Sequence, residues 1–542
     1  MPAGNQRRGK SRTGAKSRIA FIGPNTSGAL APAAFGNKAA NLAKMATLGV
    51  PVPPAFVLPV SVCDDFYRSG ERLPEDLPDL LSSGLRHLEL ATGLRYGDRR
   101  RPLLVSVRSG APVSLPGLME TILNVGLSRQ TVEGLVFMTG DPRFAWDSYR
   151  RLVQNVGQTV YGHDPAIYEA VLTCTLRTEG LPDADELDSR TLRSLANEYE
   201  ELFAEVTGSR FPVNPAEQLK LAVTAVLRSA HGPRVESLVK AGMLREAPST
   251  AVTVQTMVFG NVGMDSGAGV VFTRNPATGE PGLMVDFKLS AQGDDVVSGR
   301  AAGSAGDFDE TLPEAARELL AVCRKLERTY KDMQDIEFTV QEKNLYILQS
   351  RAGKRAPLAA LRIAVDLVSE GVLTPDDGRR RLEDVALDEI VITRVDTKER
   401  VLAHGDPAST GVASGRVAFS SQSAEVYAAK DPVILVTDAL TPDDLPGVAA
   451  AKGVLAAQGA RTSHAAVVAR QLGKVCIVNC PGLTFDTASR KVTLGVRRLK
   501  EGDVITLDGN TGNVYWGAIT VTEERPEALL STVSGWASDQ QA

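Results

Sequence analysis

A single histidine near the C-terminal end of the chain has neighbours that suit covalent phosphate chemistry. His464 follows Gly459 and Ser463 and precedes a run of small apolar residues. Ser463 is a good helix N-cap, so we expect His464 in the first turn of a helix over about 463–472. The free N–H groups of a first helical turn favour an anion, and imidazole is a competent nucleophile near neutral pH. The segment predicts a phosphate-carrying histidine; the alternative is a histidine that only begins a helix.

A second candidate site is a pair of carboxylates in the segment 335–340. With the two-residue period of a strand, Asp335 and Glu337 share one face, and Ile336 and Phe338 share the other. Adjacent carboxylates repel each other unless water or a cation neutralises them. Mg²⁺ bound to nucleotide phosphates is the natural cation, and a solvated strand face is the alternative.

The next strand, around 345–351, places Gln349 and Arg351 on one face, and residues 341–344 read as a hairpin turn. Pairing Asp335 with Arg351 and Glu337 with Gln349 in a regular ladder requires an odd loop centred on Lys343. A three-residue loop with Asn344 left-handed is one example of such an odd loop, whereas a two-residue loop would place these side chains on opposite faces.

The N-terminal half offers cations and a glycine-containing loop, which are the groups that a triphosphate needs. Lys38 is expected at the start of a helix over 37–48, and Arg108 near the end of a strand that begins at Leu103. The segment 114–121 reads as a loop that runs into a helix. Each signal alone is weak, since most lysines and arginines lie on protein surfaces.

The candidate site residues are spread along the chain, so several helices and strands must position them, and the sequence divides into separate parts. Helical patterns dominate from about 125 to 245, and strand patterns return from Val252. We expect these parts: a disordered basic tail, 1–22; a nucleotide-binding module, 23–355, with subdomains of about 23–245 and 246–355; a charged helical linker and candidate hinge, 356–394; a histidine module, 395–520; and a C-terminal tail, 521–542.

Composition narrows the class of protein. The 542 residues carry a formal net charge of −5, which argues against general nucleic-acid binding. No apolar stretch is long enough for a membrane span. The five cysteines include no CxxC pair, which argues against zinc or disulfides and favours a reducing cytoplasm. We expect Cys476 and Cys480 to be buried and inert.

The segment 459–470 resembles the phosphohistidine signature of the phosphoenolpyruvate-utilising enzymes, most closely that of the pyruvate, phosphate dikinase family. The resemblance implies that His464 is the phosphoryl carrier, with Arg461, Thr462 and Ser463 as its neighbours. Ala460 departs from the usual glycine. Thr462 matches a position that is phosphorylated in plant members, and nothing further in the sequence supports such regulation here.

The N-terminal segments resemble the ATP-grasp domain of the same family, in the same order. The resemblance implies an α+β and α/β multidomain fold, in which an ATP-grasp domain precedes a swivelling β/β/α phosphohistidine domain. It assigns Mg²⁺ to Asp335 and Glu337. It assigns ATP to six residues: Lys38, Arg108, Asp286, Asp294, Gln349 and Arg351. Asp286 and Asp294 stand where the family carries glutamates, so each is one methylene shorter.

The resemblance implies a dikinase that moves phosphoryl from ATP to His464 and on to pyruvate, with AMP, phosphate and pyrophosphate as further reactants. The family's pyruvate or phosphoenolpyruvate site is a barrel of about 250 residues, so we expect another chain to supply it. A homodimer is left open. Two alternatives remain: a dikinase with a different acceptor, such as a small alcohol, phenol or antibiotic, and a catalytically silent nucleotide-binding regulatory protein.

Overall fold

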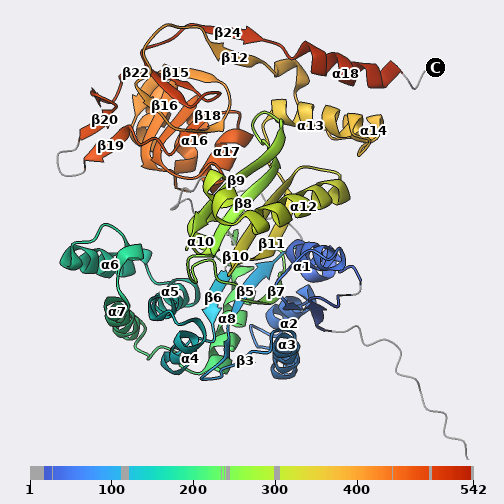
Figure 1. Ribbon diagram of the computed structural model, residues 1–542, viewed down its shortest axis with the longest axis vertical. Helices are drawn as coiled ribbons and strands as arrows, with labels where there is room; N and C mark the ends of the chain where they lie inside the picture. The colour runs from blue at the N-terminus through green and yellow to red at the C-terminus, as the bar shows by residue number, and fades with distance from the viewer. Residues whose placement is uncertain are drawn as a thin grey trace, which may run out of the picture. The chain divides into compact units, whose positions relative to one another are not determined.

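The computed structural model forms two compact units, Met1–Met257 and Val258–Ala542. It describes residues 18–26, 28–111, 121–232, 235–236, 239, 245–297, 305–441, 444–486 and 491–538. Within these ranges, none of the helices combines the length and the apolar character that crossing a lipid bilayer requires. The mixed helix and strand content confirms the multidomain α/β class expected from the sequence (Figure 1).

The first unit is built on a five-stranded sheet with the order β1-β2-β7-β5-β6. Its strands are β1 (Ala20–Ile22), β2 (Ala55–Leu58), β5 (Val105–Gly110), β6 (Thr121–Val125) and β7 (Ala251–Thr256). Two sequence expectations need correction. Residues 20–22, expected in the tail, pair with β2, and β7, expected in the second subdomain, lies at the centre of this sheet.

Helices and one short ribbon complete the first unit. The helices are α1 (Pro32–Thr47), α2 (Val60–Arg68), α3 (Leu77–Thr92), α4 (Arg129–Thr139), α5 (Pro142–Tyr161), α6 (Pro165–Glu179), α7 (Ser189–Thr207) and α8 (Pro215–Ser229). The ribbon pairs β3 (Arg95–Tyr96) with β4 (Pro102–Leu103). Side-chain caps fix several starts: Asp141, Asp164 and Asn214 each accept a backbone N–H and precede a proline.

A glycine bends α1 just before Lys38. Gly36 has a φ of 75°, and a Cβ at this position would lie 1.9 Å from the carbonyl oxygen of Gly110. Only glycine permits both the backbone angle and the close approach to the end of β5. The helical turn that carries Lys38 is therefore held against the strand that carries Arg108.

The second unit begins with a four-stranded antiparallel sheet of the order β11-β10-β8-β9. Its strands are β8 (Gly267–Arg274), β9 (Pro281–Leu289), β10 (Gln334–Gln341) and β11 (Asn344–Ala352). The helices beside it are α10 (Gly293–Val297), α11 (Ala305–Thr311) and α12 (Pro313–Tyr330). Phe308 of α11 packs on Phe287 and Phe338, so α11 covers one face of the sheet.

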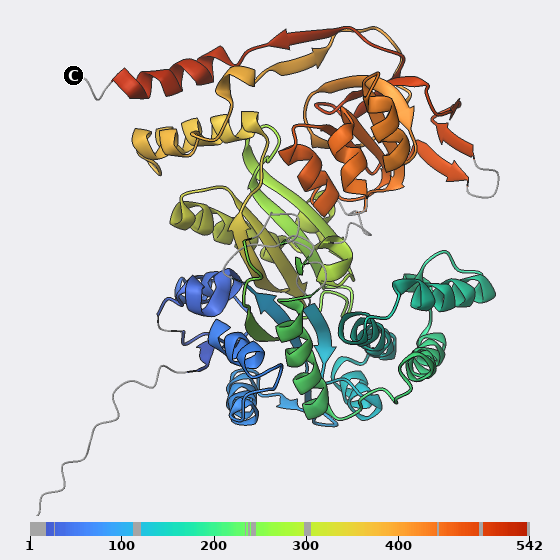
Figure 2. The same cartoon turned by 180° about the vertical axis from the view of Figure 1, so that it is seen from behind.

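The linker and the C-terminal residues form one substructure rather than a linker and a tail. Helices α13 (Pro357–Ser369) and α14 (Pro375–Arg380) are followed by β12 (Ile392–Val395). The expected tail contains β24 (Val521–Glu524), which pairs with β12, and α18 (Glu527–Ser538). Trp536 of α18 packs with Leu361 and Ile390 in one apolar cluster. Both views show α18 beside α13 (Figure 1, Figure 2).

Ion pairs fasten α13 and α14 to the four-stranded sheet and to the segment just before β10. Arg274, at the end of β8, pairs with Glu370 after α13 at 2.9 Å. Arg381, after α14, pairs with the buried Asp332 at 2.8 Å. These helices are therefore anchored, and the part of the linker that crosses freely to the next module is shorter than the sequence suggested.

The remaining module contains an eight-stranded sheet with a parallel centre, β15-β16-β17-β18. The sheet strands are β13 (Ala403–His404), β14 (Asp406–Ser409), β15 (Val412–Ala418), β16 (Val433–Ala439), β17 (Gly453–Gln458), β18 (Val475–Val478), β22 (Val504–Asp508) and β23 (Asn513–Trp516). A three-stranded sheet holds β19 (Leu483–Asp486), β20 (Lys491–Leu494) and β21 (Arg497–Leu499). The helices are α15 (Ser421–Ala428), α16 (Leu445–Ala450) and α17 (His464–Gln471).

Candidate functional site

Five candidate residues of the second unit lie in two neighbouring rows across one face of the four-stranded sheet. Directly paired residues of antiparallel strands share a face, and so do residues two apart on a strand. The first row is Gln349, Glu337, Val270 and Asp286. The second row is Arg351, Asp335, Phe272 and Met284. Five polar residues proposed from the sequence therefore share one surface.

The hairpin pairs these residues as predicted, but not through the predicted loop. Asp335 pairs with Arg351 and Glu337 with Gln349, which confirms the register. The turn contains two residues, Glu342 and Lys343, with φ of 48° and 69°, so the expectation of an odd loop was wrong. A β-bulge at Glu337/Phe338 accounts for the difference. Leu348 is the extra residue, and it moves the later part of β11 by one position.

The carboxylate of Asp335 is buried beside the guanidinium of Arg351. Asp335 is 4% exposed, and Arg351 Nε donates to its Oδ2 at 2.8 Å. Its Oδ1 has no hydrogen-bond partner among the described residues. Burial raises the pKa of Asp335, although Arg351 opposes this shift. An unsatisfied buried carboxylate oxygen on the face that also carries Glu337 suits a hard cation such as Mg²⁺.

Asp335 and Glu337 are the metal-binding candidates that the described residues offer, and two carboxylates do not complete a metal site by themselves. Within the described ranges, no group of three or more histidines, cysteines or acidic residues is arranged to hold a metal ion. Arg351 Nη2 also lies 3.9 Å from Glu337 Oε1, so one guanidinium faces both carboxylates. An ion here would take its remaining ligands from a phosphorylated substrate, which is how proteins commonly bind Mg²⁺.

The loop before α17 is bound to the same sheet face. Arg461 donates from Nε and Nη2 to Asp286 Oδ1 at 3.2 and 2.9 Å. The backbone N–H of Thr462 donates to Asp286 Oδ2 at 3.1 Å. Both oxygens of this 3% exposed carboxylate are thus occupied by the loop. The sequence proposed Asp286 for the nucleotide and did not foresee this partner.

Helix α17 begins where the sequence predicted. Ser463 is its N-cap, and the Ser463 side chain accepts a hydrogen bond from the N–H of Ala466 at 3.4 Å. His464 is the first residue of the helix, in the turn whose N–H groups favour an anion. The side chains of His464 and of Asp294, which lies in α10, fall outside the described part of the structure.

Arg470 has a structural role that the sequence did not reveal. It is completely buried, and it donates to the carbonyl oxygens of Ala408 at 2.8 Å and Arg461 at 3.0 Å. Its guanidinium lies 5.7 Å from the ring centre of Phe272. Burial lowers its pKa to about 10, so the side chain is charged at neutral pH. Arg470 therefore links the loop before α17 to the sheet face.

The cationic candidates of the first unit occupy the positions described for α1 and β5. Lys38 follows the bend at Gly36, and Arg108 Nη1 donates to Gln255 Oε1 of β7 at 3.4 Å. Residues 112–120 of the expected loop lie outside the described residues. Thr121 begins β6 and not a helix, which corrects that expectation. These residues belong to a different compact unit from the two rows.

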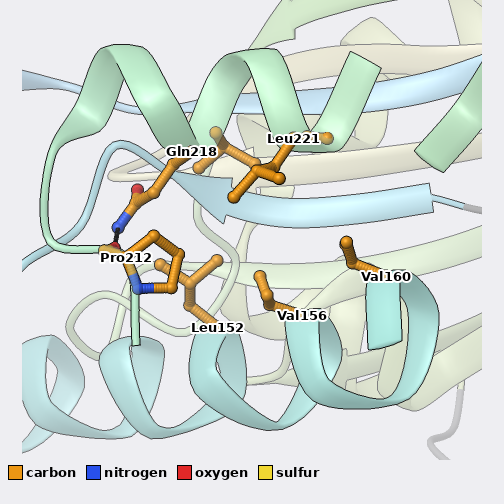
Figure 3. Close-up of a pocket in the computed structure, with 8 residues that line it drawn as sticks. Leu152, Val156, Val160, Pro212, Gln218 and Leu221 are labelled. Atoms are coloured by element: carbon orange, nitrogen blue, oxygen red, sulfur yellow. Dashed lines mark hydrogen bonds between the residues drawn. The ribbon is translucent and has the colours of Figure 1, made fainter. Parts of the chain in front are cut away.

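An apolar pocket in the first unit offers no competing chemistry (Figure 3). It is lined largely by aliphatic residues of α5 and α8, such as Leu152 and Val156. Gln218 is polar, but its Nε2 donates to Leu127 and Pro212, and its Oε1 accepts from Gly126. The amide is fully satisfied, so the pocket is a packing feature.

The cysteines of the histidine module are also chemically quiet. Cys476 and Cys480 are buried, as expected, and neither forms a disulfide. Burial raises the pKa of Cys476 to about 12, so the thiol stays protonated at neutral pH and is a poor nucleophile.

Comparison with known proteins agrees with this arrangement. Residues 70–305 and 308–370 match the family described as pyruvate phosphate dikinase, AMP/ATP-binding domain. Residues 429–512 match the family described as PEP-utilising enzyme, mobile domain. The second match contains His464 and four strands of the eight-stranded sheet: β16, β17, β18 and β22.

Individual relatives extend the similarity along most of the chain. A chloroplastic pyruvate, phosphate dikinase of Flaveria pringlei is 41% identical over 509 residues, which cover 93% of this chain and 53% of the relative. Pyruvate, phosphate dikinase 2 of Zea mays is 41% identical, covering 93% and 58%. The Rhizobium meliloti enzyme is 40% identical, with the same coverage of 93% and 58%. The chain thus spans little more than half the length of these relatives.

Proposed function

Because this chain belongs to the family of the pyruvate phosphate dikinase AMP/ATP-binding domain, we propose that it transfers phosphoryl from ATP to His464 and on to pyruvate, or the reverse. One observation carries the proposal. Helix α17, which begins at His464, is bound to the sheet face that holds Asp335 and Glu337. A nucleophilic residue is thereby brought to the surface best suited to a metal-bound phosphate.

The remaining candidate residues have complementary roles in this proposal. We assign nucleotide binding to Lys38, Arg108, Arg351 and Gln349, because their side chains can supply positive charge or polar contacts to phosphates. Asp294 and Asp286 contribute polar contacts to the nucleotide, with Asp286 free to do so when the loop leaves it. Arg461, Thr462 and Ser463 hold the histidine loop. Backbone N–H groups at the start of α17 stabilise the phosphorylated imidazole.

Asp335 and Glu337 are the residues that would hold Mg²⁺, because they share a face and Asp335 has an unsatisfied oxygen. The ion would neutralise charge on the phosphates during transfer. In the absence of a nucleotide, Arg351 provides that neutralisation for the two carboxylates. We propose that Arg351 turns toward the phosphates when they bind.

The proposed chemistry has three transfers, each of which involves His464. The imidazole attacks the β-phosphorus of ATP, and the bond to the α-phosphate oxygen breaks to release AMP. Inorganic phosphate then accepts the γ-phosphoryl group, which releases pyrophosphate and leaves phosphohistidine. Pyruvate, in its enol form, finally takes the phosphoryl group to give phosphoenolpyruvate.

The pyruvate site is proposed to lie on a barrel-type chain that binds this one, and a homodimer is the simplest assembly to examine by light scattering. No nucleic acid takes part in this scheme. The five free cysteines, four of them buried, support a proposed location in a reducing cytoplasm.

The direct test is transfer of label from nucleotide to protein. The protein is incubated with Mg²⁺, phosphate and ATP labelled either at the β- or at the γ-phosphorus. We expect acid-labile label from the β position to stay on His464, and label from the γ position to leave as pyrophosphate. Addition of pyruvate with native cell extract then identifies the acceptor.

The matched control is another histidine of the same module. His404→Ala removes an exposed imidazole that contacts Asn513 and should retain labelling, whereas His464→Ala should abolish it. Absence of label on the unmodified protein would reject the proposal in favour of a silent nucleotide-binding protein. Label that pyruvate fails to remove would favour another acceptor.

A further inference from the structure

The contact between Asp286 and Arg461 joins two modules that are far apart in sequence. Asp286 lies on β9 of the four-stranded sheet, and Arg461 lies three residues before His464. Arg461 Nη2 also donates to the carbonyl oxygen of Val285 at 3.3 Å. With the Thr462 N–H on the second carboxylate oxygen, four hydrogen bonds reach the loop from two adjacent residues of one strand.

Three further contacts continue along α17. Val467 packs against the apolar cluster that contains Phe272 and Met333. Arg470 lies over the ring of Phe272. At the end of the helix, Lys354 Nζ donates to Gln471 Oε1 at 3.1 Å. The helix is therefore bound at its start, middle and end, and the ion pair fixes the end nearest the histidine.

The ion pair between Asp286 and Arg461 differs from the other contacts because it buries a carboxylate when the loop binds to the sheet. Asp286 is 3% exposed with the loop bound to it. A buried carboxylate without a partner is strongly unfavourable, so Arg461 is what makes burial of Asp286 tolerable. When the loop leaves, water can replace both donors. The pair thus stabilises one position of the histidine loop and imposes little cost on its departure.

We propose that Asp286 and Arg461 are positioning residues that hold the histidine loop on the sheet during the step in which ATP phosphorylates His464. This inference rests on the proposed function. Neither residue needs to touch the reacting atoms through this contact, because the pair acts by fixing the start of α17. The pair is expected to control the rate of histidine phosphorylation and not the affinity of the protein for nucleotide.

The kinetic test uses Arg461, which has no proposed nucleotide contact. In single turnovers with β-labelled ATP, Arg461→Met should lower the rate of His464 labelling by roughly 10- to 100-fold, as expected for a misplaced nucleophile. The nucleotide dissociation constant, measured by calorimetry, should stay within about twofold of the unmodified protein's. Arg461→Lys keeps one charged donor and should recover part of the rate. An unchanged rate in Arg461→Met would overturn the proposal.

The matched control is a surface ion pair in the same module. Arg416 Nε lies 2.9 Å from Asp431 Oδ2, and both side chains are about half exposed. Arg416→Met should leave both the labelling rate and the nucleotide affinity unchanged. If both arginine variants slow labelling equally, the effect is a general loss of charge and the positioning role is rejected.

A second readout does not depend on catalysis. Spin labels are placed at Val496→Cys, in the exposed turn before β21, and at Glu318→Cys on α12, in a Cys174→Ser background that removes the exposed cysteine. The unmodified pair should give one narrow distance distribution by electron spin resonance, and Arg461→Met or Asp286→Asn should broaden it. A broad distribution before any substitution, or no change after it, would contradict the proposed docking.

The two readouts separate failure of this inference from failure of the proposed function. If His464 is never labelled but Arg461→Met still broadens the distances, the activity is wrong and the docking contact stands. If His464 is labelled and neither readout responds to Arg461→Met, the activity stands and the positioning role is wrong.

Discussion

Asp335 and Arg351 are paired across β10 and β11 through a salt bridge of 2.8 Å, although the turn that joins the strands has the wrong length for a regular ladder to do this. Near the turn, Val340 pairs with Leu345. Beyond the bulge at Glu337/Phe338 the register moves by one residue, which brings Arg351 to the face of Asp335. The bulge therefore decides which side chains reach the candidate metal site.

Removal of the extra residue of the bulge should be tolerated. Deleting Leu348 joins the two registers into one regular ladder and keeps Gln349 opposite Glu337. Inserting a glycine after Leu348 should instead turn Gln349 and Arg351 to the opposite face. We expect the deletion to keep nucleotide-dependent labelling of His464 within about threefold, since the pairs are preserved. The insertion should abolish labelling. If the insertion keeps labelling and the deletion abolishes it, the register of the hairpin does not control the site.

Asp335 should control the magnesium requirement. In Asp335→Asn, the Mg²⁺ concentration needed for half-maximal thermal stabilisation by ATP should rise by roughly 10–100-fold or more, because even supporting residues of metal sites have effects of this size. Glu342→Gln, in the exposed turn of the same hairpin, is the control and should behave like the unmodified protein. Equal magnesium dependence in both variants would place the ion elsewhere.

The first unit should lose stability in acid through Asp147. This carboxylate is buried and binds Arg150 at 2.6 Å and Arg151 at 2.7 Å. Burial alone would raise the pKa of Asp147, but the two guanidinium groups outweigh it and hold the pKa well below its usual range. The stabilisation is complete above the unfolded pKa of about 3.9 and decreases as the pH falls below it.

Asp147→Asn should therefore destabilise the first unit by about 3–5 kcal/mol at neutral pH, because the buried Arg150 and the partly buried Arg151 lose their partner. The same variant should show a weaker dependence on pH below about 4. Trp146, the only tryptophan of the sequence before residue 258, reports local unfolding by fluorescence. Glu179→Gln, on an exposed face of α6, should not change the transition, and a similar loss in that control would refute the assignment to Asp147.

Trp536 should hold the C-terminal helix on the linker. It is 8% exposed and shares a cluster with Leu361 and Leu382. Replacing a large buried aromatic residue by alanine commonly costs about 3–5 kcal/mol, so Trp536→Ala should release α18. Hydrogen exchange of the α18 amides should then become fast, and exchange in α12 should not change. Val496→Ala, at a 90% exposed position, is the control; continued protection of α18 would contradict its docking.

Local signals in the sequence predicted much of the site. The position of Ser463 before a helical run predicted the start of α17, and two-residue alternation predicted the shared face of Asp335 and Glu337. The bulge was not predictable, since nothing in the run Ile347-Leu348-Gln349 marks Leu348 as an extra residue. The correct pairs were therefore inferred together with an incorrect loop.

Contacts between residues far apart in the sequence could not be predicted from such local patterns. Asp286 and Arg461 are 175 positions apart, and charge alone does not select one partner among many. Burial of Arg470 was equally hidden, because arginine is normally exposed. Helix α18 was missed despite a usable pattern: Leu529, Val533 and Trp536 recur at helical spacing.

The ribbon of β12 and β24 has a geometric consequence. Ile390 packs with the α13 cluster and Ile392 already belongs to the ribbon, so the outgoing chain crosses at Val391. The returning chain crosses at Arg525, between β24 and α18. Because Ile392 pairs with Glu524, the two crossings are adjacent. If the histidine module rotates about the line through Val391 and Arg525, both crossing points stay in place and the pairing of β12 with β24 is kept. Rotation about another axis would stretch the chain at one of the two crossings. The fold thus favours a single axis of travel for the module that carries His464.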